Sequence, residues 1–206
     1  MNTEAIVHPK LLHYGLTTAD MDAMADWYRK VLGMKLNHRS KIPAIARLTR
    51  HAPPFSGFSF VSNDERDHRI VFFQIPGATV DPEKRRHTGL QHVAFEYASL
   101  DDLLGTYLRL KGLGIVPLWA ADHGVAMAFY YEDPDQNVVE LNVNNFGEAW
   151  TATEYLETAA SGMPAQVDPE KMVVARQAGA SLWEIHKRAA AGEFAPAEPF
   201  NPAARF

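Results

Sequence analysis

The sequence predicts an α+β fold in which a β-α-β-β-β module occurs twice in tandem. Two segments, residues 11–33 (LLHYGLTTADMDAMADWYRKVLG) and 90–112 (LQHVAFEYASLDDLLGTYLRLKG), align without a gap at one constant offset (92 − 13 = 79). In each segment an apolar stretch precedes an acidic helix start, and strand-like segments follow the helix. The offset pairs His13 with His92, Ala19 with Ala98, Asp22 with Asp101, Tyr28 with Tyr107 and Gly33 with Gly112.

The helix of each module has a recognisable start, buried face and end. Residues 17–20 and 99–102 resemble N-caps followed by negative charge. The second helix has apolar side chains at i, i+3, i+4, i+7 and i+8, and the first follows the same pattern less regularly. Gly33 and Gly112 are placed to end the helices in left-handed caps. The expected buried face consists of Leu100, Leu103, Leu104, Tyr107 and Leu108 in the second helix, and Met21, Met24, Tyr28, Val31 and Leu32 in the first.

Three strand-like segments follow each helix, and Asp133–Asn137 has the composition of a turn between the last two. A sheet of this kind leaves one face exposed, and pairing of two modules would bury it. The expected strands are Met34–Arg39, Gly57–Val61 and Arg69–Ile75 in the first module, and Val116–Ala120, Val125–Tyr131 and Val138–Val143 in the second.

The two modules, about 10–76 and 88–146, are expected to form one domain over residues 1–146. Residues 41–56 are an additional loop of the first module, and residues 77–88 are a charged linker. Residues 147–206 are predicted to be a helical and proline-rich extension that covers a site, mediates association or hangs loose. Its expected parts are helices at Thr151–Ala160, Pro169–Ala178 and Ser181–Ala191, and an irregular tail at Phe194–Phe206.

Composition limits the classes of function. The chain has 206 residues, 47% of them hydrophobic, which is enough for a sizeable core. A net charge of −5 gives no indication of nucleic-acid or membrane partners, and no window approaches membrane-spanning length. There is no signal-like N-terminus, so a cytoplasmic location is expected. There is also no cysteine, so any metal must be held by nitrogen and oxygen.

The repeated histidines predict part of a metal site in an open mixed sheet. A fold that places a histidine at one spot in each half can bring His13 and His92 together across a pseudo-twofold axis. Glu140 is the best third ligand, because it is the only carboxylate within an apolar final strand. Two histidines and one carboxylate suit a divalent iron with open positions. The first module has no carboxylate that matches Glu140. The constant offset places Val61 at the equivalent position, and alignment of the last strands of the two modules places Phe72 or its neighbours there. Gln74, which is polar, keeps a four-ligand site open.

The two repeated segments, residues 11–33 and 90–112, resemble sequences of the vicinal-oxygen-chelate superfamily, as does HGVAMAFYYEDPDQNVVEL at residues 123–141. Within it, the chain is similar to the type I extradiol catechol dioxygenases over about Leu11–Phe146. The resemblance implies that His13, His92 and Glu140 bind Fe(II), with Mn(II) as the alternative metal. Gln136 replaces the glycine usual in the family's DPDGN turn, which leaves the ligands untouched.

The resemblance extends to three further residues. By this resemblance, His68 would lie beside the place where O2 binds and would act as an acid/base and hydrogen-bond donor. Tyr130 falls where the family has a tyrosine that bonds a catechol hydroxyl, with Tyr131 as its rival, because the inward face depends on the register of the sheet. His123 lies where members often have a second histidine, which can act as a base.

The implied function is extradiol ring cleavage in aromatic hydrocarbon catabolism. The expected substrates are a catechol-type diol and O2, both atoms of which enter the product, and a homo-oligomer, either a dimer or larger, is expected. Other functions on the same fold are a glyoxalase-type lyase or isomerase, a metal-dependent transferase acting on an antibiotic, and a non-catalytic aromatic- or antibiotic-binding protein. The missing fourth carboxylate disfavours the glyoxalase type, and the His-His-Glu set disfavours the binding protein.

Overall fold

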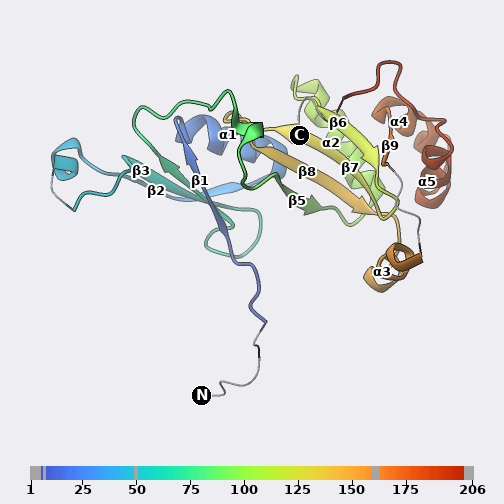
Figure 1. The fold of residues 1–206 in the computed structure, drawn as a ribbon, viewed down its shortest axis with the longest axis horizontal. Coiled ribbons are helices and arrows are strands. Elements are labelled where there is room, and N and C mark those ends of the chain that lie inside the picture. Colours follow the sequence, from blue (N-terminus) through green and yellow to red (C-terminus); the bar gives the residue numbers. More distant parts are fainter. Residues whose placement is uncertain (1–5, 7, 49–50, 159–162, 202–206) are drawn as a thin grey trace. The chain divides into compact units, whose positions relative to one another are not determined.

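The computed structural model describes residues 6, 8–48, 51–158 and 163–201, and it confirms the α+β class (Figure 1). The chain divides into two compact units, residues 1–80 and 81–206. Each unit contains the predicted β-α-β-β-β order of elements. The repeat read from the sequence is therefore a repeat of structure.

The first unit is built on a four-stranded mixed sheet in the order β1-β4-β3-β2. The outer strand β1 runs parallel to β4, and the other neighbours are antiparallel. A short 3₁₀ helix, η1, occupies Ala44–Leu48 of the additional loop. The elements are β1 (Tyr14–Thr18), α1 (Met21–Leu32), β2 (Lys35–Lys41), β3 (Gly57–Ser62) and β4 (Ile70–Gln74).

Helix α1 begins and ends as the sequence predicts. The side chain of Asp20 accepts the backbone N–H groups of Asp22 and Ala23, which caps the first turn, and Gly33 closes the last turn with φ of 67°. The ring of Tyr28 lies 5.2 Å from that of Phe72 between centroids, on the face of the sheet that the helix covers. Val71, the neighbour of Phe72 on β4, therefore points to the opposite face of the sheet.

The second unit repeats this topology and adds one strand, in the order β5-β8-β7-β6-β9. Strand β5 is parallel to β8, as β1 is to β4. A 3₁₀ turn, η2 (Lys84–Arg86), interrupts the linker. The elements are β5 (His92–Glu96), α2 (Leu100–Gly112), β6 (Trp119–Asp122), β7 (Ala126–Glu132), β8 (Val138–Asn144) and β9 (Ala165–Gln166).

Helix α2 corrects two expectations. Its N-cap is Ser99, as predicted, but the helix continues through Gly112, and the left-handed glycine is Gly114 with φ of 76°. Leu108 is 42% exposed, whereas Leu110 is fully buried. The buried face follows the i, i+4, i+7 series from Leu103 through Tyr107, which turns Leu108 towards solvent.

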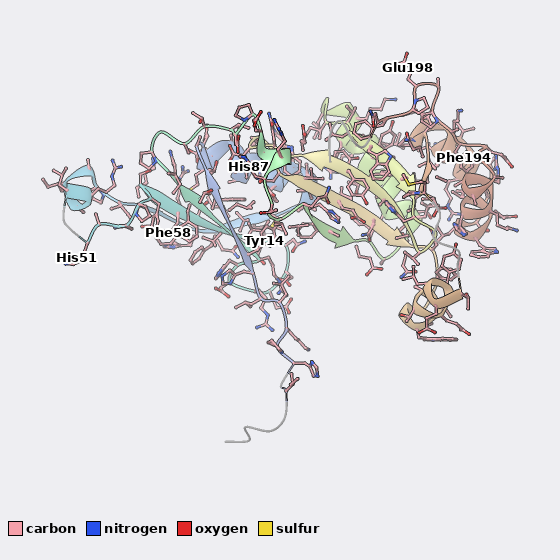
Figure 2. All side chains as sticks on the ribbon, in the orientation of Figure 1. Tyr14, His51, Phe58, His87, Phe194 and Glu198 are labelled. Atoms are coloured by element: carbon pink, nitrogen blue, oxygen red, sulfur yellow. The ribbon has the colours of Figure 1, made fainter. Side chains whose placement is uncertain are left out.

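The C-terminal region forms three helices within the second unit: α3 (Ala149–Thr158), α4 (Pro169–Gln177) and α5 (Leu182–Ala190). All three were predicted, although residues 159 and 160 of the first lie outside the described residues. Residues 194–201 are irregular, as expected, and 202–206 are likewise not described. Phe194, labelled in Figure 2, is buried with the guanidinium of Arg188 4.8 Å from its ring centroid. None of the helices in the described part of the chain is long and apolar enough to span a membrane.

Candidate metal and catalytic site

The register of the second sheet decides which tyrosine shares a face with Glu140. Tyr130 pairs directly with Glu140 across β7 and β8, whereas Tyr131 pairs with Val139. Because directly opposed residues point to the same side, Tyr130 and Glu140 lie on one face and Tyr131 lies on the other, buried under α2. His92 belongs to the Glu140 face as well, since the ladder places Ala94, two residues on, beside Glu140.

His92 and Glu140 form the centre of this face. Nε2 of His92 is 2.9 Å from Oε2 of Glu140, and only 8% of Glu140 is exposed. The hydrogen on Nδ1 of His92 is donated to the amide oxygen of Gln91. Nε2 then faces a carboxylate that can only accept, so a proton or a metal ion has to lie between the two atoms. Two ligands about 2.1 Å from one metal and at right angles are about 3 Å apart, so the pair fits a metal site.

Tyr130 and His123 extend the same face. The Tyr130 hydroxyl and Nε2 of His123 share a 2.9 Å hydrogen bond, and the Tyr130 ring is 5.7 Å from that of His92 between centroids. Burial lowers the pKa of His123, against the opposing charge of Glu140. Burial, followed by the charge of Glu140, raises the pKa of Tyr130 above its ordinary value. At neutral pH the ring is therefore a neutral base and the phenol keeps its proton.

Three residues that sequence reasoning missed support this arrangement. Nδ2 of Asn142 donates to Oε1 of Glu140 at 2.8 Å, and Gln91 orients His92 as described. Trp119 stacks on Tyr130 with ring centroids 4.9 Å apart. The i, i+2 spacing of Glu140 and Asn142 on one strand was a usable signal. The position of Trp119 was not, because it depends on the β6–β7 register.

In the first unit, the structure brings His13 and His68 together. Their ring centroids are 4.3 Å apart, and the His68 ring also stacks on Phe60, with centroids 4.2 Å apart. Asp67 lies 2.5 Å from Nδ1 of His68, and this hydrogen bond is the main reason that the pKa of Asp67 is lowered. Because the carboxylate can only accept, Nδ1 carries the hydrogen and Nε2 is left for other chemistry.

The first unit has no carboxylate at the position of Glu140. The parallel ladder of the second unit pairs Ala94 with Glu140, and the equivalent ladder of the first pairs Gly15 with Val71. Val71 is 4% exposed and cannot bind a metal. Gln74, three residues further on, belongs to the opposite face of the strand. Within neither unit do the described residues gather three or more His, Asp or Glu side chains at metal-binding distance.

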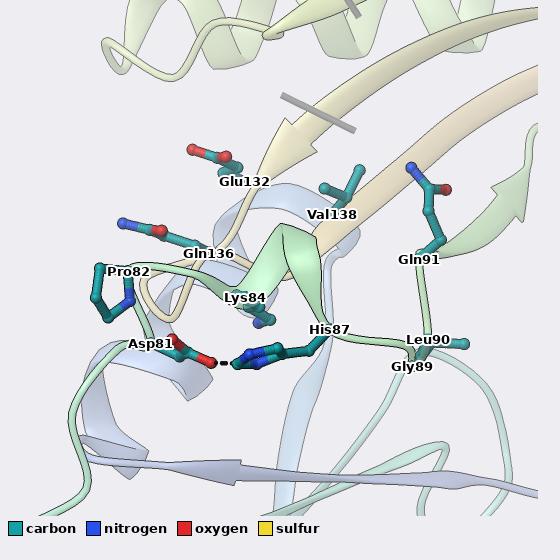
Figure 3. A pocket seen from close by; sticks show the side chains of 10 residues that line it. All are labelled: Asp81, Pro82, Lys84, His87, Gly89, Leu90, Gln91, Glu132, Gln136 and Val138. Carbon is teal, nitrogen blue, oxygen red and sulfur yellow. Dashed lines mark ion pairs between the residues drawn. The ribbon is translucent and has the colours of Figure 1, made fainter. Parts of the chain in front are cut away.

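A cavity of about 180 Å³ lies along the linker in the second unit (Figure 3). Asp81 and His87 form an ion pair of 2.8 Å at its edge, and Gln91 connects it to the His92 ring. Its mixed charges come from Asp81, Lys84, His87 and Glu132. None of the six predicted site residues lines it, so we do not assign it to the substrate.

Comparison with known families decides the classification. Residues 10–141 match the model of the Glyoxalase/Bleomycin resistance protein/Dioxygenase superfamily. The chain belongs to this superfamily. The match includes all six residues predicted to bind metal or substrate, and helices α3–α5 follow it in the chain.

Two relatives are similar to this chain over nearly their whole length, both from Rhodococcus globerulus. Biphenyl-2,3-diol 1,2-dioxygenase 3 is 33% identical over 186 residues, which covers 89% of this chain and 90% of the relative. Biphenyl-2,3-diol 1,2-dioxygenase 2 is 33% identical over 197 residues, covering 94% and 95%. The similarity therefore includes the C-terminal helices.

Solved structures show the superfamily fold at lower identity. A glyoxylase/bleomycin resistance protein/dioxygenase domain from Frankia sp. EAN1pec is 20% identical with a TM-score of 0.55, covering 69% of this chain and 96% of its own. Glyoxalase I of Leishmania major is 16% identical with a TM-score of 0.51, covering 73% and 97%. At these identities, the likeness concerns the fold alone.

Proposed function

We propose that this protein is an Fe(II)-dependent extradiol dioxygenase that opens the ring of a catechol-type substrate. O2 is the co-substrate, both of its atoms enter the product, and the ring breaks next to the diol to give a muconic semialdehyde-type compound. The observation that carries the proposal is the His92–Glu140 pair, with Tyr130 and His123 on the same sheet face. The 33% identity to two biphenyl-2,3-diol 1,2-dioxygenases supports it.

The proposed metal ligands are His92, Glu140 and His13. The 2.9 Å distance between His92 and Glu140 supports the first two, and His13 is the residue that the internal repeat makes equivalent to His92. Fe(II) is the proposed metal and Mn(II) the alternative. When bound, the metal would lower the pKa of the diol hydroxyls and offer open positions for the diol and oxygen.

Tyr130 and His123 are proposed to orient the diol and to move its proton. The phenol keeps its proton at neutral pH, so it can donate to a diol oxygen. His123 is neutral, hydrogen-bonded to the same hydroxyl and half-buried, so it can take up a proton. Trp119 covers the Tyr130 ring and keeps water from this side of the pair.

His68 is proposed to act on the oxygen side of the substrate. Its Nδ1–H is bound by Asp67, which fixes the ring and leaves Nε2 to hold or release a proton. Phe60 supports the ring on one side, and Phe58, whose centroid lies 5.3 Å from that of Phe60, continues the apolar surface. An aromatic substrate suits such a surface.

The glyoxalase-type alternative has less support. A closed four-ligand site would require a fourth donor at the position equivalent to Glu140, and that position is the buried Val71. An open site with three protein ligands instead leaves room for both a diol and oxygen.

Anaerobically prepared Fe(II) protein, mixed with catechol or 2,3-dihydroxybiphenyl and then with oxygen, tests the function. We expect stoichiometric oxygen uptake and a yellow ring-opened product. His68→Asn should lower kcat by about 10²-fold and leave iron bound, because the residue handles a proton without binding metal. Absence of oxygen uptake with both diols, despite bound iron, would exclude the proposed reaction. Loss of iron in His68→Asn would show that the ligand set is wrong.

A further inference from the structure

A buried polar cluster ties helix α5 to the end of strand β6. Nδ1 of His186 is 2.6 Å from Oδ2 of Asp122, and Nδ2 of Asn145 is 2.9 Å from Oδ1 of the same carboxylate. The three residues are between 3% and 7% exposed. His186 and Asp122 are 64 residues apart in the chain. The proposed reaction uses none of these groups, so their burial needs another reason.

The cluster holds the loop that carries His123. Oδ1 of Asp122 accepts the backbone N–H of Gly124 at 2.8 Å, and Nδ2 of Asn145 donates to the Gly124 carbonyl at 3.1 Å. The N–H of His123 itself is bonded to the Ala126 carbonyl at 2.9 Å. Both peptide groups of Gly124 are thus bound through the cluster, and the loop between β6 and β7 has little freedom.

Helix α3 packs against the same loop. Gly124 has φ of 83°, and a Cβ there would lie 2.9 Å from the hydroxyl oxygen of Tyr155. The Tyr155 ring is 5.2 Å from Phe146, which in turn is 5.8 Å from Trp183 of α5. Two C-terminal helices therefore enclose the loop of His123.

The hydrogen-bond pattern shows how His186 contributes. A carboxylate only accepts, so the hydrogen of the 2.6 Å contact is on Nδ1 of His186. Asn145 has two amide hydrogens, which bond Asp122 and Gly124. Its 3.2 Å approach to Nδ1 of His186 is therefore a packing contact. Asp122 depends on His186 for the only donor to its Oδ2 among the described residues.

A buried pair of this kind is a poor source of net stability, because desolvation offsets most of its attraction. The His186–Asp122 pair does, however, restrict the two residues, and the loop bound to them, to one conformation. We propose that His186 is a positioning residue for His123: by binding Asp122, it fixes the β6–β7 loop so that the His123 ring meets the Tyr130 hydroxyl. This inference rests on the proposed role of His123, and it makes the C-terminal helices part of the catalytic apparatus.

The test compares three variants of the full-length, iron-loaded protein with 2,3-dihydroxybiphenyl. His186→Leu removes the donor to Asp122, His186→Asn keeps an N–H near the Nδ1 position, and Ile185→Ala opens a cavity in α5 beside the cluster. We expect His186→Leu to lower kcat by about 10²-fold, His186→Asn to restore most of it, and Ile185→Ala to lower Tm with kcat unchanged. Equal kcat in His186→Leu and Ile185→Ala would overturn the inference.

A double-mutant cycle separates positioning from a general structural effect. In a His123→Ala background, His186→Leu should cause no further loss of kcat, because the residue it positions is gone. Additive losses would refute the inference. Should His186→Leu fail to fold, Asn145→Ala, which retains the His186–Asp122 pair but frees the Gly124 carbonyl, is expected to lower kcat in the same direction.

A spectroscopic measurement tests the positioning of His123 without relying on turnover. Imidazole ¹⁵N spectra of the metal-free protein should show His123 as a single fixed tautomer in the wild type and as an averaged, mobile ring in His186→Leu. An unchanged His123 signal would refute positioning even in an active enzyme. Absence of turnover in the wild type would refute the proposed function, and the spectra would still decide whether His186 holds the loop.

Discussion

At the scale of single residues, Glu140 interacts with three of the polar side chains on this face of the second sheet. One of its oxygens lies 2.9 Å from Nε2 of His92 and the other accepts from Asn142, while the charge contributes to the raised pKa of Tyr130. A carboxylate buried to this extent needs a compensating cation. The arrangement therefore has a direct consequence for metal affinity.

Glu140→Gln should lower the affinity for Fe(II) by at least about 10²-fold, because the amide has almost the same shape but no charge. Anaerobic titration with Fe(II), followed by measurement of bound iron, checks this. Glu154→Gln, an exposed glutamate on α3, is the matched control and should bind iron as the wild type does. Full retention of iron in Glu140→Gln would remove this residue from the ligand set.

The sequence indicated some of these residues and could not indicate others. The equivalence of His13 and His92 is visible because the repeat has no gap between them, and Glu140 is visible as a charge in an apolar strand. The choice of Tyr130 over Tyr131 was not visible, since a shift of one residue exchanges the two faces of a strand. The Gln91 contact and the stacked Trp119 depend on side-chain placement, which no periodicity encodes.

At the scale of elements, helix α4 is attached to α2 by polar contacts at the edge of the buried face. The Tyr107 hydroxyl donates to Oε1 of Glu170 at 2.5 Å, and Nζ of Lys111 lies 2.6 Å from the same oxygen. Arg176 forms a two-pronged ion pair with Asp101, at 2.6 and 2.8 Å. Both helices were predicted from the sequence, but nothing local indicates which helix packs on which.

Tyr107→Phe should reduce the free energy of unfolding by about 1–2 kcal/mol, because it removes a hydrogen bond to a charged group. Tyr131→Phe is the matched control: its hydroxyl is buried without a hydrogen-bond partner among the described residues, so its removal should cost nothing. Urea unfolding of both variants, followed by far-UV circular dichroism, measures the difference. Equal losses in the two variants would mean that the Glu170 contact does not stabilise the docking of α4.

Strand β9 shows where sequence patterns fail at this scale. It has two residues, Ala165 and Gln166, without any alternation of polar and apolar side chains, and it was not predicted. It forms because the edge of β6 offers unpaired backbone groups to a passing segment. Gln166 then binds both backbone groups of Phe200, at 2.7 and 2.8 Å, and so holds the irregular tail.

At the scale of the whole molecule, paired surface carboxylates and His123 make folding stability change with pH in the same direction. Arginine or lysine partners lower the pKa of several carboxyl groups, most strongly Asp64 beside Arg69, with Asp101 beside Arg176 as a further case. Burial lowers the pKa of His123 in the same direction. In each case the unfolded chain binds a proton more readily than the folded one. The stability gained is therefore present above the ordinary pKa and is lost as pH falls.

The Tm of the metal-free protein should accordingly fall on acidification in two windows. The first begins below the ordinary histidine pKa of 6.5, where His123 is protonated more readily in the unfolded chain. The second begins near the ordinary aspartate pKa of 3.8 and continues as the paired carboxylates are protonated. Thermal scans by circular dichroism from pH 7.5 to 3 measure both windows.

Two variants assign the two pH windows to their residues. His123→Asn should reduce the fall of Tm in the first window and leave the fall in the second unchanged. Arg176→Gln should reduce the fall of Tm in the second window, because it returns the pKa of Asp101 towards its ordinary value. A wild-type Tm that is constant between pH 6.5 and 4.5 would show that His123 is not withdrawn from water. Because the two residues occur in different parts of the second unit, their effects should add in the double variant, and failure of additivity would indicate that acidification disturbs the unit as a whole.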